Sequence, residues 1–260
     1  MKRSGSRTRT VILGLTVTLL LAVGAWAITG DEVLQRSQEA MRPGQDATIT
    51  ERMTIAKPDG QTDVLELKMY MKGEKTLIRV LAPEDFAGIG LLILPQEDGG
   101  EEIWLYLPAF RDVKQIVAES LSEGFVGSDF AYEDLTVRYT SKWDVTSMSE
   151  EEGQYVLTLA PKPEAQLSYS GARMWVDQET FLPTRAEFDR EGELLKVLTL
   201  SEVQDFPSVA DPETSYPTPT RIEMANVKTG SRTLIELLEV EYDTGLSDDF
   251  FTVRNLKRGE

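Results

Sequence analysis

The chain of 260 residues contains no histidine and no cysteine, and its 44 acidic side chains outnumber the 27 basic ones. The lack of histidine excludes Ser-His-Asp and Cys-His catalysis, and the lack of cysteine excludes disulfides, thiolate zinc sites, iron–sulfur clusters and N-terminal acylation at a cysteine. With 41% hydrophobic residues the chain is expected to be globular. Carboxylate chemistry and binding therefore remain as possible functions.

The N-terminal segment has the pattern of a targeting sequence. Four basic residues lie among the first nine positions, an apolar run covers residues 11–23, and Ala25-Trp26-Ala27 follows. The run is shorter than the roughly 20 residues that a membrane-spanning helix needs. This predicts a signal peptide over residues 1–27, cleaved after Ala27, and export of residues 28–260 as one domain to the bacterial periplasm. An uncleaved membrane anchor is the alternative.

Removal of residues 1–27 makes the protein more acidic. That segment carries four positive and no negative charges, so the net charge falls from −17 to −21. Such a surface repels nucleic-acid phosphates and anionic lipid headgroups. We therefore expect no nucleic-acid partner and only transient contact with a membrane.

One helix is expected at the start of the exported chain, and strands after it. Thr29 and Glu32 fit a capping box, and apolar residues at helical spacing follow until Pro43 and Gly44. From Ile49 onward, apolar residues alternate with polar ones. The predicted strands are residues 49–55, 65–71, 76–81, 88–94, 103–107, 113–117, 155–159, 172–176, 185–188, 194–200, 220–227 and 233–240.

The connections between these strands indicate an antiparallel fold. Glycine-containing turns separate strand candidates at residues 58–60, 72–74, 98–100, 191–192 and 229–230. About a dozen strands in meander order predict a mainly β protein with one large curved antiparallel sheet. Residues 207–219 are expected to form a surface loop. Between residues 118 and 143 we expect two short helices lying over one mouth of the curved sheet, the second capped by Ser128 or Asp129 and ending at Leu135.

Acidic residues form two candidate sites. The cluster over residues 97–102 lacks the ligand spacing of a calcium loop and fits a solvated hairpin tip. Asp129, Glu133 and Asp134 could supply the carboxylate pair of a glycoside hydrolase, although helix capping and a solvated helix face also explain them. We predict no catalytic residue, no metal site and no cofactor.

The apolar strand faces are open to two interpretations. An ordinary core explains them, and so does a cavity between the curved sheet and its covering helices. Methionine suits a cavity because it adapts to irregular space. The candidates for the lining are Leu65, Leu67, Met69, Met71, Leu91, Ile93, Trp104, Leu105 and Tyr106.

Residues 69–135 contain a series of short motifs: residues 71–73, 75–79 and 83–88, the block Trp104-Leu105-Tyr106-Leu107-Pro108-Ala109, the motif Gly127-Ser128-Asp129-Phe130, and Tyr132-Glu133-Asp134-Leu135. In these motifs the chain resembles the LolA-like outer-membrane lipoprotein-sorting proteins. The resemblance implies an unclosed antiparallel β-barrel covered by a few short helices, with an apolar cavity for acyl chains. Relatives often carry several basic residues after the Pro-Ala block, whereas residues 110–114 contain only two.

The resemblance also implies a function and partners. We expect a non-enzymatic periplasmic carrier, or chaperone, that takes lipoprotein acyl chains or other lipids from an inner-membrane transporter to an outer-membrane acceptor. One alternative is an envelope-stress sensor of the same fold, although those proteins have a second domain for which 233 residues leave little room. A carboxylate-dependent hydrolase is the third hypothesis.

Overall fold

The computed structural model describes residues 28–97 and 100–258. The predicted signal peptide with its cleavage site after Ala27, and the tip Asp98-Gly99 of one expected hairpin, lie outside these residues. Within them, thirteen strands form a single antiparallel sheet that does not close, which confirms the predicted fold class. The strands are β1 (Asp46–Ala56), β2 (Thr62–Lys72), β3 (Lys75–Ala82), β4 (Gly90–Pro95), β5 (Glu101–Leu107), β6 (Asp112–Ile116), β7 (Trp143–Glu151), β8 (Gln154–Pro161), β9 (Gly171–Asp177), β10 (Pro183–Arg190), β11 (Glu193–Pro207), β12 (Ser215–Asn226) and β13 (Arg232–Tyr242).

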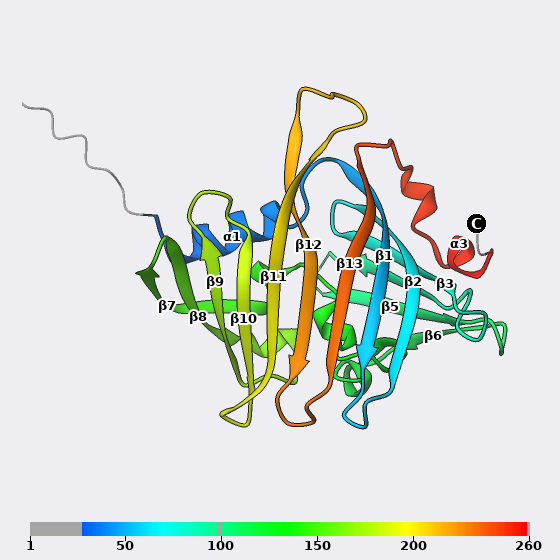
Figure 1. Cartoon of the computed structure of the whole chain (residues 1–260), viewed down its shortest axis with the longest axis horizontal. Helices are drawn as coiled ribbons and strands as arrows, with labels where there is room; N and C mark the ends of the chain where they lie inside the picture. The colour runs from blue at the N-terminus through cyan, green and yellow to red at the C-terminus, as the bar shows by residue number, and fades with distance from the viewer. Residues whose placement is uncertain (1–27, 98–99, 259–260) are drawn as a thin grey trace, which may run out of the picture.

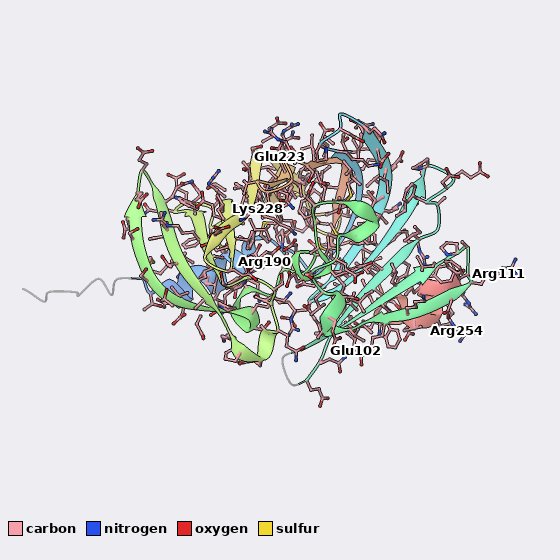
Figure 2. The ribbon with its side chains drawn as sticks, turned by 90° about the horizontal axis from the view of Figure 1, so that it is seen from below. Glu102, Arg111, Arg190, Glu223, Lys228 and Arg254 are labelled. Carbon is pink, nitrogen blue, oxygen red and sulfur yellow. The ribbon has the colours of Figure 1, made fainter. Side chains whose placement is uncertain are left out.

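The sheet consists of two meanders joined at its centre. Strands β1 to β6 lead outward to one edge, and β7 to β13 return from the other edge until β13 pairs with β1. The sheet curls into an arc that is open on one side, with β6 and β7 as its two edges (Figure 2). Residues 117–142, which we call the crossover segment, connect these edges across the concave side. The crossover segment therefore covers the side chains that face the inside of the arc.

Two parts of the strand prediction are wrong. The pattern missed β7, because it is an edge strand with mostly exposed or half-exposed side chains and therefore no clear apolar alternation. Much of the expected 207–219 loop is strand, since β11 runs to Pro207 and β12 starts at Ser215. Pro217 and Pro219 are tolerated there because β13 pairs with β12 only from Arg221 onward, so these prolines have a strand neighbour on one side only.

Few helices accompany the sheet. Helix α1 (Gly30–Ala40) has the predicted capping box of Thr29 and Glu32 and packs its buried face near the β7 edge. A four-residue helix, α2 (Tyr139–Lys142), ends the crossover segment, and α3 (Val253–Arg258) packs over β4, β5 and β6. The remaining turns are 3-10 helices: η1 (Ala118–Ser120), η2 (Phe125–Gly127), η3 (Tyr132–Asp134), η4 (Pro163–Ala165) and η5 (Asp248–Phe250). No helix in the described part of the chain is long and apolar enough to cross a membrane.

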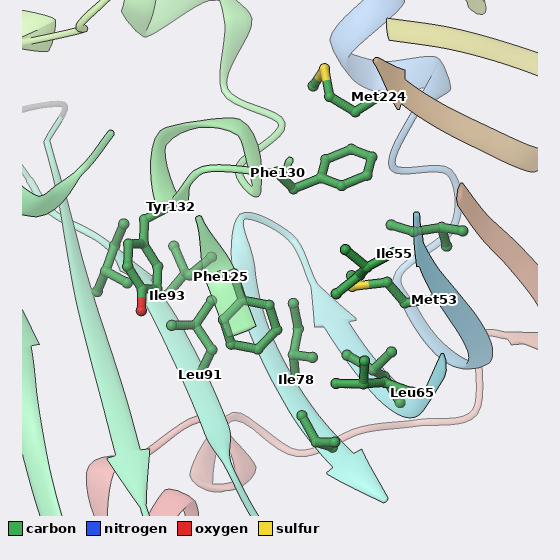
Figure 3. Close-up of a cluster of buried hydrophobic side chains, with 14 residues drawn as sticks. Met53, Ile55, Leu65, Ile78, Leu91, Ile93, Phe125, Phe130, Tyr132 and Met224 are labelled. Carbon is green, nitrogen blue, oxygen red and sulfur yellow. The ribbon is translucent and has the colours of Figure 1, made fainter. Parts of the chain in front are cut away.

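The largest core cluster lies between the concave face of the sheet and the crossover segment (Figure 3). Phe125, Phe130 and Tyr132 of the crossover segment pack there against inward-facing residues of the strands, such as Met53 and Leu91. Burial of such side chains contributes about 1.5–3 kcal/mol each. The crossover segment is therefore a packed layer rather than a free loop.

Candidate functional site

An apolar cavity of about 160 Å³ lies beside this core, on the concave side of the sheet. Its walls come from β1, β2, β3, β11, β12 and β13, from the crossover segment, and from the residues that follow α1. The lining residues are Ala40, Met41, Arg42, Pro43, Ile49, Glu51, Met53, Leu67, Met69, Met71, Thr76, Ile78, Phe125, Phe130, Asp134, Leu135, Val137, Tyr139, Leu198, Leu200, Pro217, Thr218, Pro219, Ile222, Ile235, Leu237 and Tyr242. Residues 40–43, at the end of α1 and just after it, are half-exposed, as are several lining residues of β2 and of the crossover segment.

A smaller cavity of about 70 Å³ adjoins the first. The side chains of Phe130, Val137, Tyr139 and Leu198 line both cavities and thus separate them, together with Asp134. The smaller cavity extends toward β8, β9 and β10. Most of its lining is apolar, with Glu133, Thr136 and Lys142 among the polar exceptions.

The structure separates the predicted lining residues into three groups. Leu67, Met69 and Met71 line the cavity, because alternate residues of β2 face inward. Trp104 and Tyr106 belong to a cluster with Leu256 of α3 and lie outside the cavity lining. The others are part of the core cluster or pack against it: Leu65, Leu91, Ile93 and Leu105.

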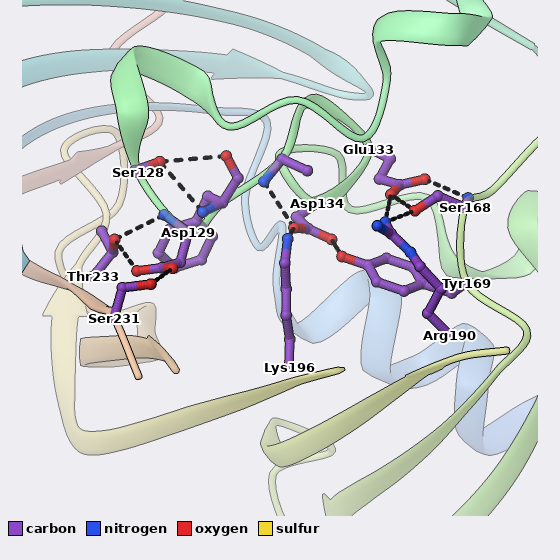
Figure 4. Close-up of polar contacts among 12 residues, drawn as sticks. Ser128, Asp129, Glu133, Asp134, Ser168, Tyr169, Arg190, Lys196, Ser231 and Thr233 are labelled. Atoms are coloured by element: carbon purple, nitrogen blue, oxygen red, sulfur yellow. Dashed lines mark hydrogen bonds and ion pairs between the residues drawn. The ribbon is translucent and has the colours of Figure 1, made fainter. Parts of the chain in front are cut away.

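The residues of the Gly127–Phe130 motif attach the crossover segment to the sheet. Gly127 has a φ of +81°, a conformation that favours glycine. Asp129 accepts a hydrogen bond from the Thr233 hydroxyl at 2.8 Å and another from Ser231, so it ties the segment to β13 (Figure 4). The expected N-terminal cap of a second helix is wrong, since Ser128 ends η2 as its C-cap and the N-cap of η3 is Ala131. Phe130, by contrast, points into the interior and lines both cavities.

Glu133 and Asp134 also hold the crossover segment in place (Figure 4). Asp134 forms a buried ion pair with Lys196 at 2.9 Å and accepts a hydrogen bond from the Tyr169 hydroxyl at 2.8 Å. Burial, and next the charge of Asp134, raise the pKa of Tyr169, which keeps this phenol protonated. Glu133 accepts hydrogen bonds from the backbone N–H and the hydroxyl of Ser168. These partners favour a structural role over the acid and base of a hydrolase.

A further anchor comes from the predicted hairpin tip. Glu101 pairs with the buried ammonium of Lys142 at 2.7 Å, and Lys142 also donates to the Glu133 carbonyl at 3.0 Å. This acid is therefore not simply solvated. In residues 28–97 and 100–258, no group of three or more acidic side chains is arranged to hold a metal ion.

Arg42 lines the cavity just beyond the end of α1. Its guanidinium donates to the carbonyls of Gly73 and Lys75 and to the Thr76 hydroxyl, and so links the end of α1 to β3. Burial lowers the pKa of Arg42 to about 10. The side chain therefore stays protonated at neutral pH and places a positive charge at this end of the cavity.

The sequence prediction passed over most of the lining residues, and Glu51 is the acidic strand residue among them. It is 4% exposed and lies on the inward face of β1, between Ile49 and Met53. Burial raises the pKa of Glu51 to about 7. An acidic residue at an inward position of an otherwise apolar alternation was the pattern that could have revealed it.

The open sheet, the bridging segment and the apolar interior together define a half-barrel that can enclose an aliphatic ligand. Solved structures of similar fold include an outer membrane lipoprotein-sorting protein domain from Vibrio parahaemolyticus, 28% identical, with a TM-score of 0.76 and coverage of 88% of this chain and 98% of the other. A DUF1329 family protein from Desulfovibrio piger is 26% identical, with a TM-score of 0.75 and coverages of 87% and 97%. A LolA superfamily protein from Nitrosomonas europaea, 21% identical with a TM-score of 0.69 and coverages of 88% and 100%, shares the fold.

A family model described as "Uncharacterized protein" matches residues 72–258. The comparison with curated proteins gave no match. The chain belongs to the family that this model describes. Its fold is that of the outer membrane lipoprotein-sorting protein domain and of the LolA superfamily protein.

Proposed function

We propose that this protein is a non-enzymatic carrier that shields the acyl chains of lipoproteins or other lipids during their transfer to the outer membrane. The observation that supports this most is the apolar cavity lined by Leu67, Met69 and Met71 inside an open sheet. A relative of the same fold is described as an outer membrane lipoprotein-sorting protein domain. Four acids flanking the interior, Glu101, Asp129, Glu133 and Asp134, already have protein partners, which argues against hydrolysis.

Transfer of an acyl chain through water requires a protein that shields the chain. Each exposed methylene costs about 0.8 kcal/mol, so a chain of about sixteen carbons costs on the order of 10 kcal/mol in water. A cavity of about 160 Å³ is similar in size to an engineered cavity of about 150 Å³ that holds one benzene molecule. A long chain therefore needs additional space. Displacement of Phe130 and Val137, which separate the two cavities, is the shortest way to provide it.

The proposed route crosses the periplasm. The targeting pattern of residues 1–27 supports export, and the net charge of −21 for the remainder opposes retention on anionic bilayers. An inner-membrane transporter as donor and an outer-membrane acceptor complete the route. Replacement of Ala27 by proline is expected to block processing and to increase the mass of the exported protein; release at the normal mass would contradict cleavage at this site.

Native mass spectrometry of protein purified from the periplasm of its own cells tests the carrier function. A co-purified acyl compound, lost on delipidation and regained on incubation with lipid, supports it. A protein partner without lipid would favour the sensor hypothesis instead. If the purified protein is lipid-free and does not bind any aliphatic compound added to it, the carrier proposal is wrong.

A further inference from the structure

Glu51 occupies the middle of the cavity wall. In the sheet it lies opposite Leu67 of β2 and Leu237 of β13, and both of these leucines also line the cavity. It is four residues beyond Ala47, which corresponds to about 13 Å along the strand from the end of the sheet near α1. A group that meets Glu51 must therefore enter the interior.

Glu51 differs from the other buried acids in the described part of the chain. Asp46 accepts hydrogen bonds from Thr244, Gly245 and Leu246, and Asp129 and Glu133 each have partners as described above. The Glu51 carboxyl has neither a hydrogen-bond nor an ion-pair partner among residues 28–97 and 100–258. Neither of its oxygens is among the fully enclosed unpaired atoms of the described residues, so the carboxyl faces the open space of the cavity.

Most other polar groups of the lining are already engaged. The Arg42 Nε atom and the Tyr139 hydroxyl have no hydrogen-bond partner among the described residues, but neither group contributes to the raised pKa of Glu51, which comes from burial alone. Arg42 donates to β3 and its turn, Asp134 pairs with Lys196, and the Tyr242 hydroxyl is hydrogen-bonded to Thr218. The walls immediately around Glu51 are aliphatic. A partner for its carboxyl must therefore come from a molecule inside the cavity.

We propose that Glu51 is a ligand-recognition residue, and that the cavity selects aliphatic amphiphiles carrying a hydrogen-bond donor, such as an ammonium, amide N–H or hydroxyl group, over free fatty acids. A donor pairs with the carboxyl, and a cationic donor also neutralises it. A carboxylate placed at the same depth meets a group of the same charge in an apolar environment, which is unfavourable. This inference rests on the proposed carrier function, because it assigns the chemistry of that same cavity.

The test compares three ligands with chains of twelve carbons: dodecylamine, dodecan-1-ol and laurate. Each displaces diphenylhexatriene, a fluorescent hydrocarbon without polar groups, from the delipidated protein at pH 8. We expect dodecylamine to bind at least tenfold more tightly than laurate. In Glu51→Gln this preference should fall at least fivefold, and Glu51→Leu should also weaken binding of dodecan-1-ol.

Glu66→Gln on the exposed face of β2 is the matched control, and it should keep the preference of the unaltered protein. Diphenylhexatriene should bind all variants, which shows that the cavity is intact. Equal preference for the amine in the unaltered protein and in both Glu51 variants would overturn the assignment of Glu51 while leaving the carrier function in place. Failure of the unaltered protein to bind diphenylhexatriene or any of the three ligands would overturn both.

Discussion

The replacement Glu51→Gln tests the burial of this carboxyl through the pH dependence of stability. The pKa of Glu51 is about 7 in the folded protein and about 4.5 in the unfolded chain. Between pH 4.5 and about pH 7, the folded protein therefore keeps the Glu51 proton, whereas the unfolded chain has lost it. The stability that comes from protonated Glu51 is complete below about pH 4.5, decreases as the pH rises to about 7, and is absent above it.

The magnitude follows from the size of the shift. A difference of about 2.5 pH units, at 1.36 kcal/mol each, corresponds to about 3 kcal/mol. Glutamine does not titrate, so the variant should gain about 3 kcal/mol relative to the unaltered protein between pH 4.5 and pH 8. The sign is opposite for Asp177 and Asp243, whose pKa values are lowered. At Asp177 burial raises the pKa but hydrogen bonds from Thr180 and Glu179 together outweigh it, and at Asp243 hydrogen bonds are the main cause. The contributions of Asp177 and Asp243 are the same in Glu51→Gln and in the unaltered protein, so they cancel when the two free energies of unfolding are subtracted.

Urea unfolding of delipidated protein, followed by tryptophan fluorescence at several values of pH, measures this difference. Lipid must be removed because a ligand that pairs with Glu51 would itself change the titration. Glu66→Gln, which removes an exposed carboxylate, should show a difference that hardly varies with pH. A difference between Glu51→Gln and the unaltered protein that stays constant from pH 4.5 to pH 8 would refute the reasoning.

Three other changes probe the cavity and its cover. Met69→Glu, at a half-buried position of the lining, should leave a folded protein that binds diphenylhexatriene less well. Leu65→Glu, four residues away on the same strand in the closed core, should unfold the protein, and unfolding of both variants would argue against an open space at Met69. Phe130→Ala should lower the free energy of unfolding in urea by about 3–5 kcal/mol. Because the change joins the two cavities, longer alkyl chains should displace diphenylhexatriene more readily from this variant. The same dependence on chain length in the variant and in the unaltered protein would contradict the role of Phe130 as the wall between the cavities. Asp134→Asn leaves the buried Lys196 without a charged partner and should lower the free energy of unfolding by about 3–5 kcal/mol. Adding Lys196→Met should recover part of that stability, and a double variant as unstable as Asp134→Asn alone would contradict the ion-pair explanation.

The sequence by itself determined the features that depend on neighbouring residues. The alternation in β1 and β2, and the glycines in the turns that join strands, identified most of the sheet, because side-chain direction in a strand reverses at every residue. The capping box at Thr29 was equally readable, since both of its partners lie within one helical turn. The family motif Gly127–Phe130 located the segment that covers the sheet, although its hydrogen bonds were predicted incorrectly.

Only the tertiary structure decided which apolar face became cavity, which became core and which met α3. Trp104 and Leu105 are adjacent in sequence, yet the first packs with α3 and the second against the central core. The partners of Asp129 lie more than one hundred residues away, and Glu51 could be recognised as unpaired only once every group around it was placed. Local patterns report the period of a strand, whereas burial and pairing are set by the distant segments that close over it.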